Sequence, residues 1–114
     1  MNSDLNCIWR VIYIMLPGII LISCNPQKQK SIPVKHIIEI KEMRFQPAEL
    51  SVHAGDTVEW INRDFVDHDV TEENKKEWSS TPLAAGKSWH RVITKSAGYY
   101  CSIHQVMKGK LLVQ

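Results

Sequence analysis

The sequence predicts a small all-β domain, built as a sandwich or barrel. After residue 35, strand-like stretches of four to seven residues are separated by turn residues, and no stretch shows a long run of the 3.6-residue period of an amphipathic helix. The composition of the 114 residues, 44% hydrophobic and 23% charged, provides enough apolar surface for one packed core. We therefore expect a single folded domain over residues 36–114.

The individual strands follow from local pattern and from breakers such as Pro47 and Gly55. In the stretch TVEWIN, Val58 and Trp60 fall on one face, as the two-residue alternation of a strand requires. The polar segment 72–80 is expected to be a solvated loop or a single helical turn. Strands are expected at residues 36–41, 49–52, 57–62, 66–71, 88–94, 98–101 and 110–113.

Residues 1–23 are expected to be a signal peptide rather than part of the fold. Positions 11–22 are mostly apolar but too short to span a membrane comfortably. They end in LISC, which resembles the bacterial lipobox, where the chain is cut before the cysteine and that cysteine is acylated. Lipidation is therefore expected at Cys24. The alternatives are an uncleaved anchor or a buried strand with a chance cysteine.

Residues 24–35 are expected to form the acylated end and a flexible tether, because they are polar and contain two prolines. The chain would then be an exported bacterial lipoprotein that faces the periplasm or the cell exterior and touches the membrane only through its lipid. Cys7 leaves with the signal and Cys24 carries the lipid, so Cys101 has no partner for an internal disulfide. Cys101 is therefore a free thiol or a metal thiolate.

The charge pattern excludes one class of partner. The formal net charge is +2, and no basic block is longer than the pair Lys75 and Lys76. We expect no nucleic-acid binding.

The stretch CSIHQVMKG, residues 101–109, places a thiol, an imidazole and a thioether three residues apart. A loop between two strands can turn Cys101, His104 and Met107 toward one point. One Cys, two His and a weak axial Met make the trigonal site that holds copper for electron transfer. His68 is the best candidate for the second imidazole. Taken singly, these residues are more often a buried thiol, a core methionine and surface histidines.

The chain from residue 36 onward resembles the cupredoxins, most closely in their amicyanin form. The matching stretches are GDTVEWINRD at 55–64, HDV at 68–70 and CSIHQVMKGKLLV at 101–113. The resemblance implies a cupredoxin-like Greek-key β-sandwich or barrel. It also implies one type 1 (blue) copper site, with ligands His68, Cys101, His104 and Met107.

Two positions depart from the pattern of that family. Asp69 stands where the family commonly has Asn; its N–H can still donate to the cysteine sulfur, but its ionised side chain can only accept. Two residues stand between Gly98 and Cys101, where relatives usually have about five. Either the turn has moved to Lys95 and Ser96 with Gly98 inside the strand, or the strand is short.

The resemblance implies a protein that shuttles single electrons at the cell envelope, not an enzyme. Copper enzymes of this kind need a second copper site, often with His-x-His pairs, and the sequence has none. The rival hypothesis is copper handling, either storage or delivery, with the same ligands. The family's exposed ligand corresponds to His104, where we expect redox proteins to dock transiently on a monomer. We expect an apolar patch around it, formed by Phe65, Val66, Leu83, Ile103 and Val106.

The remaining aromatic and histidine residues are given structural roles. His36, His53 and His90 lack matching partners and are expected on the surface. Trp60, Trp78 and Trp89 are expected to pack in the core or its loops.

Overall fold

The computed structural model describes residues 22–27 and 29–114. The predicted signal peptide therefore lies almost wholly outside the described residues, together with Cys7. In the described part of 22–31 the chain is exposed and forms neither helix nor strand. No helix among the described residues is long and apolar enough to cross a membrane. Residues 32–114 form a compact unit by themselves.

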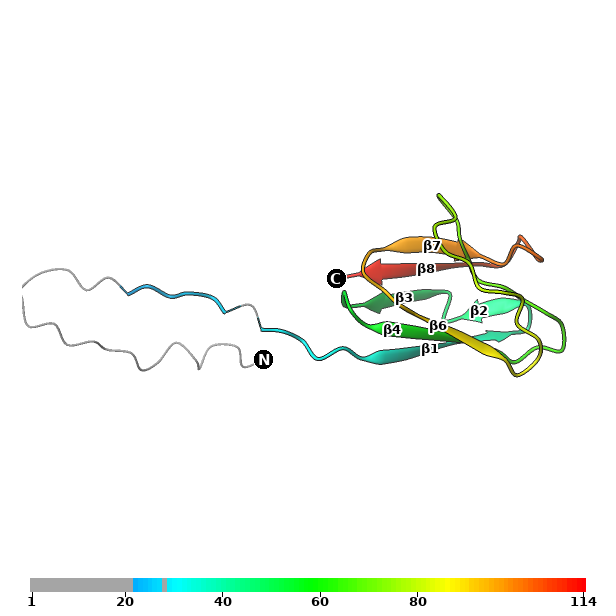
Figure 1. The fold of residues 1–114 in the computed structure, drawn as a ribbon, viewed down its shortest axis with the longest axis horizontal. Coiled ribbons are helices and arrows are strands. Elements are labelled where there is room, and N and C mark those ends of the chain that lie inside the picture. Colours follow the sequence, from blue (N-terminus) through cyan, green and yellow to red (C-terminus); the bar gives the residue numbers. More distant parts are fainter. Residues whose placement is uncertain (1–21, 28) are drawn as a thin grey trace, which may run out of the picture. The chain divides into compact units, whose positions relative to one another are not determined.

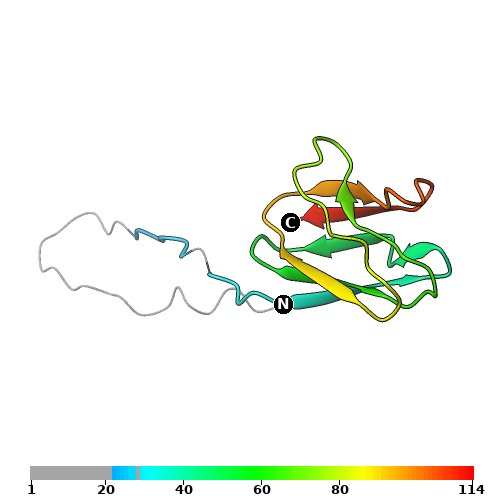
Figure 2. The ribbon, with the colours of Figure 1, turned by 45° about the vertical axis from the view of Figure 1, so that its right-hand side comes forward.

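This unit consists of eight strands in two four-stranded sheets. They are β1 (Lys35–Lys41), β2 (Arg44–Gln46), β3 (Glu49–Val52), β4 (Thr57–Asn62), β5 (Thr71–Glu72), β6 (Ser88–Val92), β7 (Ala97–Tyr100) and β8 (Lys108–Val113). One sheet has the order β2-β1-β4-β6 and the other the order β3-β8-β7-β5. Figure 1 shows β7 and β8 facing β1, β4 and β6, and Figure 2 shows the same two layers from a second direction.

Two strand pairs are parallel, so both strands of each pair begin at the same end of the sandwich and finish at the other end. β1 runs alongside β4 from the pair Lys35–Thr57 to the pair Ile40–Asn62, and β3 runs alongside β8. The loop that joins β7 to β8 lies at the end where β1 and β4 finish (Figure 1). The chain therefore enters the sandwich at one end, and CSIHQVM lies at the other.

The core lies between the two sheets and contains a cluster of aromatic rings. Trp60 on β4 meets Tyr99 on β7 edge to face, with ring centroids 5.4 Å apart, and Phe45 contacts Tyr99 at 4.8 Å. The Tyr99 ring lies directly against Gly109, where any Cβ atom would overlap it. Its hydroxyl has no hydrogen-bond partner among the described residues, and burial raises the pKa of Tyr99 to about 12.

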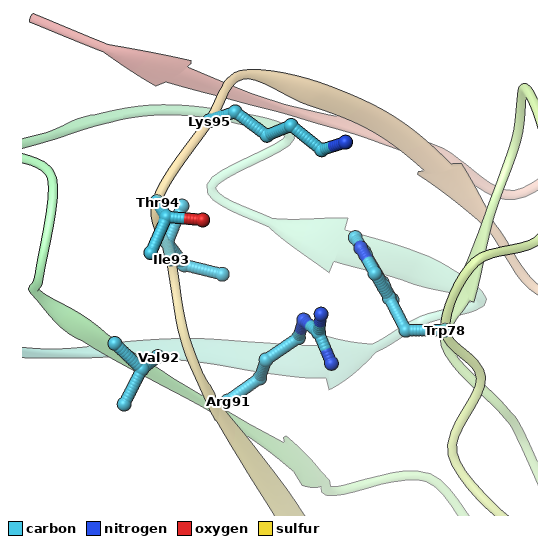
Figure 3. A pocket seen from close by; sticks show the side chains of 6 residues that line it. All are labelled: Trp78, Arg91, Val92, Ile93, Thr94 and Lys95. Carbon is cyan, nitrogen blue, oxygen red and sulfur yellow. The ribbon is translucent and has the colours of Figure 1, made fainter.

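The long connection from β5 to β6 closes one side of this core. It buries Trp78, whose ring centroid lies 6.2 Å from that of Trp60 and 6.0 Å from that of Trp89. The guanidinium of Arg91 sits over the Trp78 ring at 5.3 Å, a cation–π contact. Figure 3 shows the shallow hollow around this pair, whose other lining residues are Val92, Ile93, Thr94 and Lys95.

Most of the predicted strands are confirmed, and the all-β class is confirmed with them. β1, β3, β4, β6, β7 and β8 occupy the predicted places to within two residues at each end. The ambiguity at Gly98 is resolved, because this residue lies inside β7 and pairs with Lys110. The packing expected of the three tryptophans is also confirmed, since each contacts another aromatic ring.

The strand predicted at 66–71 is wrong, and β2 was missed. Over 66–70 only His68 forms a bridge, with Leu83, because the preceding backbone is engaged by the side chain of Asn62. β2 has only three residues and stops just before Pro47. Its hairpin turn at residues 42–43 contains no Gly, Asn or Asp, so it carries no turn signal.

The prediction that residue 72 lies in a solvated loop is also wrong. Glu72 belongs to β5 and is buried, and its carboxylate accepts the N–H groups of Asn74, Lys75 and Glu77. Burial opposes ionisation, but these N–H groups prevail and lower the pKa of Glu72. The side chain thus fixes the shape of the exposed loop that follows it.

At the entry end of the sandwich, the buried carboxylate of Asp56 fixes the beginning of β1. It accepts the N–H of Val34 at 2.9 Å, the N–H of His53 at 3.0 Å and the ring Nε2 of His36 at 2.8 Å. The hydrogen bond from Val34, followed by those from His36 and His53, lowers the pKa of Asp56 to about 2. His36 is therefore a partly buried partner of Asp56 rather than the surface residue that was predicted.

Asp56 gives the fold a defined acid sensitivity. Its pKa is about 2 in the folded chain against an ordinary 3.8, so its contribution to stability is present above pH 3.8 and disappears as pH falls through about 2. We predict that the free energy of unfolding of Asp56→Asn varies less between pH 4 and 2 than that of the wild type, measured by urea titration of tryptophan fluorescence. The exposed Glu49→Gln variant should keep the wild-type slope; equal slopes in all three proteins would contradict the assignment.

Candidate metal centre

Asn62, the last residue of β4, shapes the loop that delivers His68. It faces the core beside Trp60 and is fully buried, so its amide must find partners within the protein. Its Nδ2 donates to the carbonyls of Val66 and Leu83, both at 2.8 Å, and its Oδ1 accepts the N–H of Asp64 at 2.9 Å. These bonds fold residues 63–67 back, and His68 follows in a fully buried position.

The second loop, residues 101–107, closes on itself between β7 and β8. The N–H of Cys101 donates to the carbonyl of Met107 at 3.1 Å, and the N–H of Met107 donates to the carbonyl of His104 at 3.0 Å. Cys101 and Met107 are buried, whereas His104 is partly exposed. The antiparallel pairing of β7 with β8 holds both ends of this short loop.

The two loops bring three of the predicted ligands together. The Cys101 sulfur lies 3.8 Å from Nδ1 of His68 and 3.8 Å from Nδ1 of His104, and the three ligand atoms lie within 4.8 Å of one another. A thiolate with two imidazoles, and a thioether buried in the same loop, is a donor set suited to copper in either oxidation state. The described residues therefore fit the copper that the sequence pattern implies.

Asp69 joins the two ligand loops. Its N–H donates to the Cys101 sulfur at 3.4 Å, as predicted. Its carboxylate accepts the N–H of Ser102 at 2.7 Å and also the hydroxyl groups of Ser102 and Thr71. Asp69 is thus a buried brace and not a solvated acid, because an acceptor-only side chain has found three donors here.

Asp64 is the partner of the buried ring of His68. Its Oδ2 lies 2.9 Å from Nε2 of His68, and its two oxygens also accept the N–H groups of Glu42 and Met43. Partial burial disfavours the charge of Asp64, but the donors from Met43, Glu42 and His68 together lower the pKa of this carboxyl. An ionised Asp64 accepts a hydrogen bond from the N–H at Nε2, and this leaves Nδ1 of His68 with its lone pair on the side of Cys101.

Residues 32–114 match the sequence profile of the copper binding proteins of the plastocyanin/azurin family. The chain belongs to this family. Family membership and the His/Cys/His/Met cluster together support one type 1 copper site in this cupredoxin.

Two curated relatives are amicyanins. The chain is 30% identical over 84 residues to the amicyanin of Paracoccus denitrificans, in a match that covers 68% of this chain and 64% of that protein. It is 28% identical over 83 residues to amicyanin-alpha of Methylorubrum extorquens, covering 68% of this chain and 70% of the relative. The chain thus spans just under two thirds of the length of the Paracoccus protein.

Solved structures show the same cupredoxin fold. A copper(I) form of an amicyanin variant superposes with a TM-score of 0.65 at 26% identity, covering 70% of this chain and 82% of that one. A purple cupredoxin from Nitrosopumilus maritimus superposes with a TM-score of 0.64 at 26% identity, covering 68% of this chain and 98% of that one.

Three residues that support the ligands, Asn62, Asp64 and Ser102, were not predicted from the sequence. Asn62 carried a usable signal, because it falls on the same inward face as Val58 and Trp60, and a polar residue on a buried face needs a reason. Asp64 and Ser102 carried none, since nothing local distinguishes a supporting Asp or Ser from a solvated one.

Proposed function

We propose that this chain is a type 1 copper electron-transfer protein in which His68, Cys101, His104 and Met107 hold one copper. The observation that carries the proposal is the approach of a buried thiol and two imidazole nitrogens to within 4.8 Å of one another, from two loops that Asp69 joins. When bound, copper supplies a one-electron couple between Cu(II) and Cu(I).

The protein's part in this reaction is to restrict the motion of its ligands and to shield them from water. His68 and Cys101 are fully buried, and the backbone of His68 is fixed to Leu83 by two hydrogen bonds of 3.2 and 2.7 Å. The N–H of Asp69 points at the thiol sulfur, where it stabilises the thiolate. Ligands held in this way move little when an electron arrives or leaves. The reorganisation energy of electron transfer is therefore small.

The partly exposed His104 is the proposed port for electrons, and the proposed docking patch consists of exposed apolar residues in its own loop and in the loop that precedes His68. Phe65 and Val106 are 100% and 91% exposed, and Val66 and Ile103 are about half exposed. Leu83 does not belong to this patch, because it is buried beneath His68. A small apolar surface suits brief encounters with redox partners.

We also propose that residues 1–23 are a signal peptide, that Cys24 is acylated and that residues 24–35 tether a copper domain of residues 36–114. The support is the LISC stretch, whose cysteine is exposed, and the polar, proline-containing segment that follows it. The chain would then be an anchored lipoprotein on the periplasmic or outer side of a bacterial membrane.

The copper site predicts a colour that depends on one cysteine. With Cu(II), the chain should show the intense thiolate-to-copper band of a blue copper protein, and Cys101→Ser should abolish it, because the band requires the sulfur. Cys24→Ser, which removes the other described thiol, should leave it unchanged. A colourless protein that binds only Cu(I) would contradict electron transfer and favour copper handling.

The apolar patch predicts a specific defect in docking. Val106→Asp should slow electron self-exchange between oxidised and reduced copies by at least about tenfold, equivalent to ~1.4 kcal/mol, because two like charges would meet on contact. The rate is measured from NMR line broadening. Val92→Asp is the matched control, since Val92 is exposed on β6 and pairs with Thr57 at the entry end. Equal rates in the two variants would place docking elsewhere.

The lipid anchor predicts incorporation of fatty acid. Cells that express the full chain and are fed a tagged palmitate should label it, and Cys24→Ala should prevent the labelling, since acylation needs the thiol. An unlabelled wild-type chain in a host that labels its own lipoproteins would rule the anchor out.

A further inference from the structure

The turn between β1 and β2 breaks the residue rule for its type. Lys41 pairs with Arg44, so the hairpin has a two-residue loop, Glu42 and Met43. Both residues have positive φ, 55° and 58°, as a type I′ turn requires. Asn and Gly are favoured at such positions, whereas Glu and Met carry a steric cost there. Because nothing within the turn offsets the unfavourable backbone conformation of these two residues, we expect an interaction from another part of the fold to stabilise it.

The compensation comes from Asp64, across the end of the sandwich. Its Oδ1 accepts the N–H of Glu42 at 2.8 Å, and its Oδ2 accepts the N–H of Met43 at 2.9 Å. The carboxylate therefore holds both N–H groups that this turn conformation directs outward. No other side chain among the described residues bonds to these two groups.

The same Asp64 oxygen that holds Met43 also lies 2.9 Å from Nε2 of His68. The backbone of Asp64 is fixed in turn by its N–H bond to Asn62. The turn and the buried ring thus share one carboxylate. A movement of the turn would move this carboxylate and change its hydrogen bond to His68, and a movement of His68 would change the bonds to the turn.

We propose that the β1–β2 turn is a positioning element for His68, acting through Asp64. The turn holds the carboxylate in one orientation, and the carboxylate keeps the proton of His68 on Nε2 and its lone pair on Nδ1. This inference rests on the proposed role of His68 as a copper ligand. Coupling of this kind is reciprocal, so disturbing His68 also loosens the turn.

The structure offers a matched control in the same loop. Asp67 lies next to His68, is exposed, and makes no hydrogen bond or ion pair with the described residues. Neutralising Asp67 changes the local charge as much as neutralising Asp64 does, but it breaks no bond to the turn. A comparison of the two variants therefore separates hydrogen bonding from simple charge.

The first experiment compares Asp64→Asn with Asp67→Asn. An amide can accept at only one atom and donates at the other, so Asp64→Asn cannot hold both turn N–H groups and His68. In the metal-free chain we expect amide hydrogen exchange of Glu42 and Met43 to quicken at least about tenfold. We also expect nitrogen NMR shifts to report mixed protonation of the two His68 ring nitrogens. With copper bound, dissociation of the metal should quicken about 10- to 100-fold. Asp67→Asn should match the wild type in all three measurements.

The second experiment changes the turn and leaves Asp64 intact. One glycine inserted between residues 42 and 43 moves the two N–H groups away from the carboxylate. His68 should then show the same mixed protonation as in Asp64→Asn, while core amides such as that of Trp60 keep their protection. An unchanged His68 in a chain with a protected core would overturn the proposal. If the inserted chain does not fold, Asp64→Asn decides the matter: a loosened turn with an unchanged His68 ring would overturn it equally.

The two proposals fail in different ways. A wild-type chain with no blue band would remove the electron-transfer function, but the metal-free comparison would still decide whether the turn positions His68.

Discussion

The site depends on one constraint: ligands carried by two different sheets must stay together before any metal binds them. His68 follows β4 of one sheet, whereas Cys101, His104 and Met107 lie between two strands of the other. Asp69 satisfies this constraint most directly, because its backbone holds the thiol of Cys101 while its carboxylate holds Ser102. A buried brace of this kind confines both loops in the absence of the metal, so binding has less conformational freedom to remove.

The other polar groups around Asp69 form a series in which each group is hydrogen-bonded to the next. Asn62 holds the backbone of the first loop, Asp64 holds the ring of His68, and the β1–β2 turn holds Asp64. Each member is satisfied by the next, which is the condition under which buried polar groups specify a structure rather than destabilise it. The apolar core beneath, built around Trp60 and Tyr99, supplies the burial that keeps water from competing for these bonds.

The sequence predicted the strands with clear alternation and the ligand cluster with a distinctive spacing. TVEWIN was recognisable because its period is local, and CSIHQVM because few other functions need those residue types at that interval. The segment around His68 was mistaken for a strand, since its β-like composition conceals a backbone already bonded to Asn62. The turn at Glu42 and Met43 was unpredictable for a related reason. Its stability comes from Asp64, a residue 21 or 22 positions away, and not from its own side chains.

The parallel pairing of β1 with β4 has a consequence for encounter rates. β1 starts at the end of the sandwich opposite the ligand loop, so the proposed tether would join the domain at the end that does not carry the ligand loop. The ten residues 25–34 reach at most roughly 36 Å when fully extended. If Cys24 is acylated as proposed, a domain on so short a tether would stay within a thin layer next to the membrane. Partners confined to that layer would meet it at a high effective concentration, so even a weak docking surface would be occupied often.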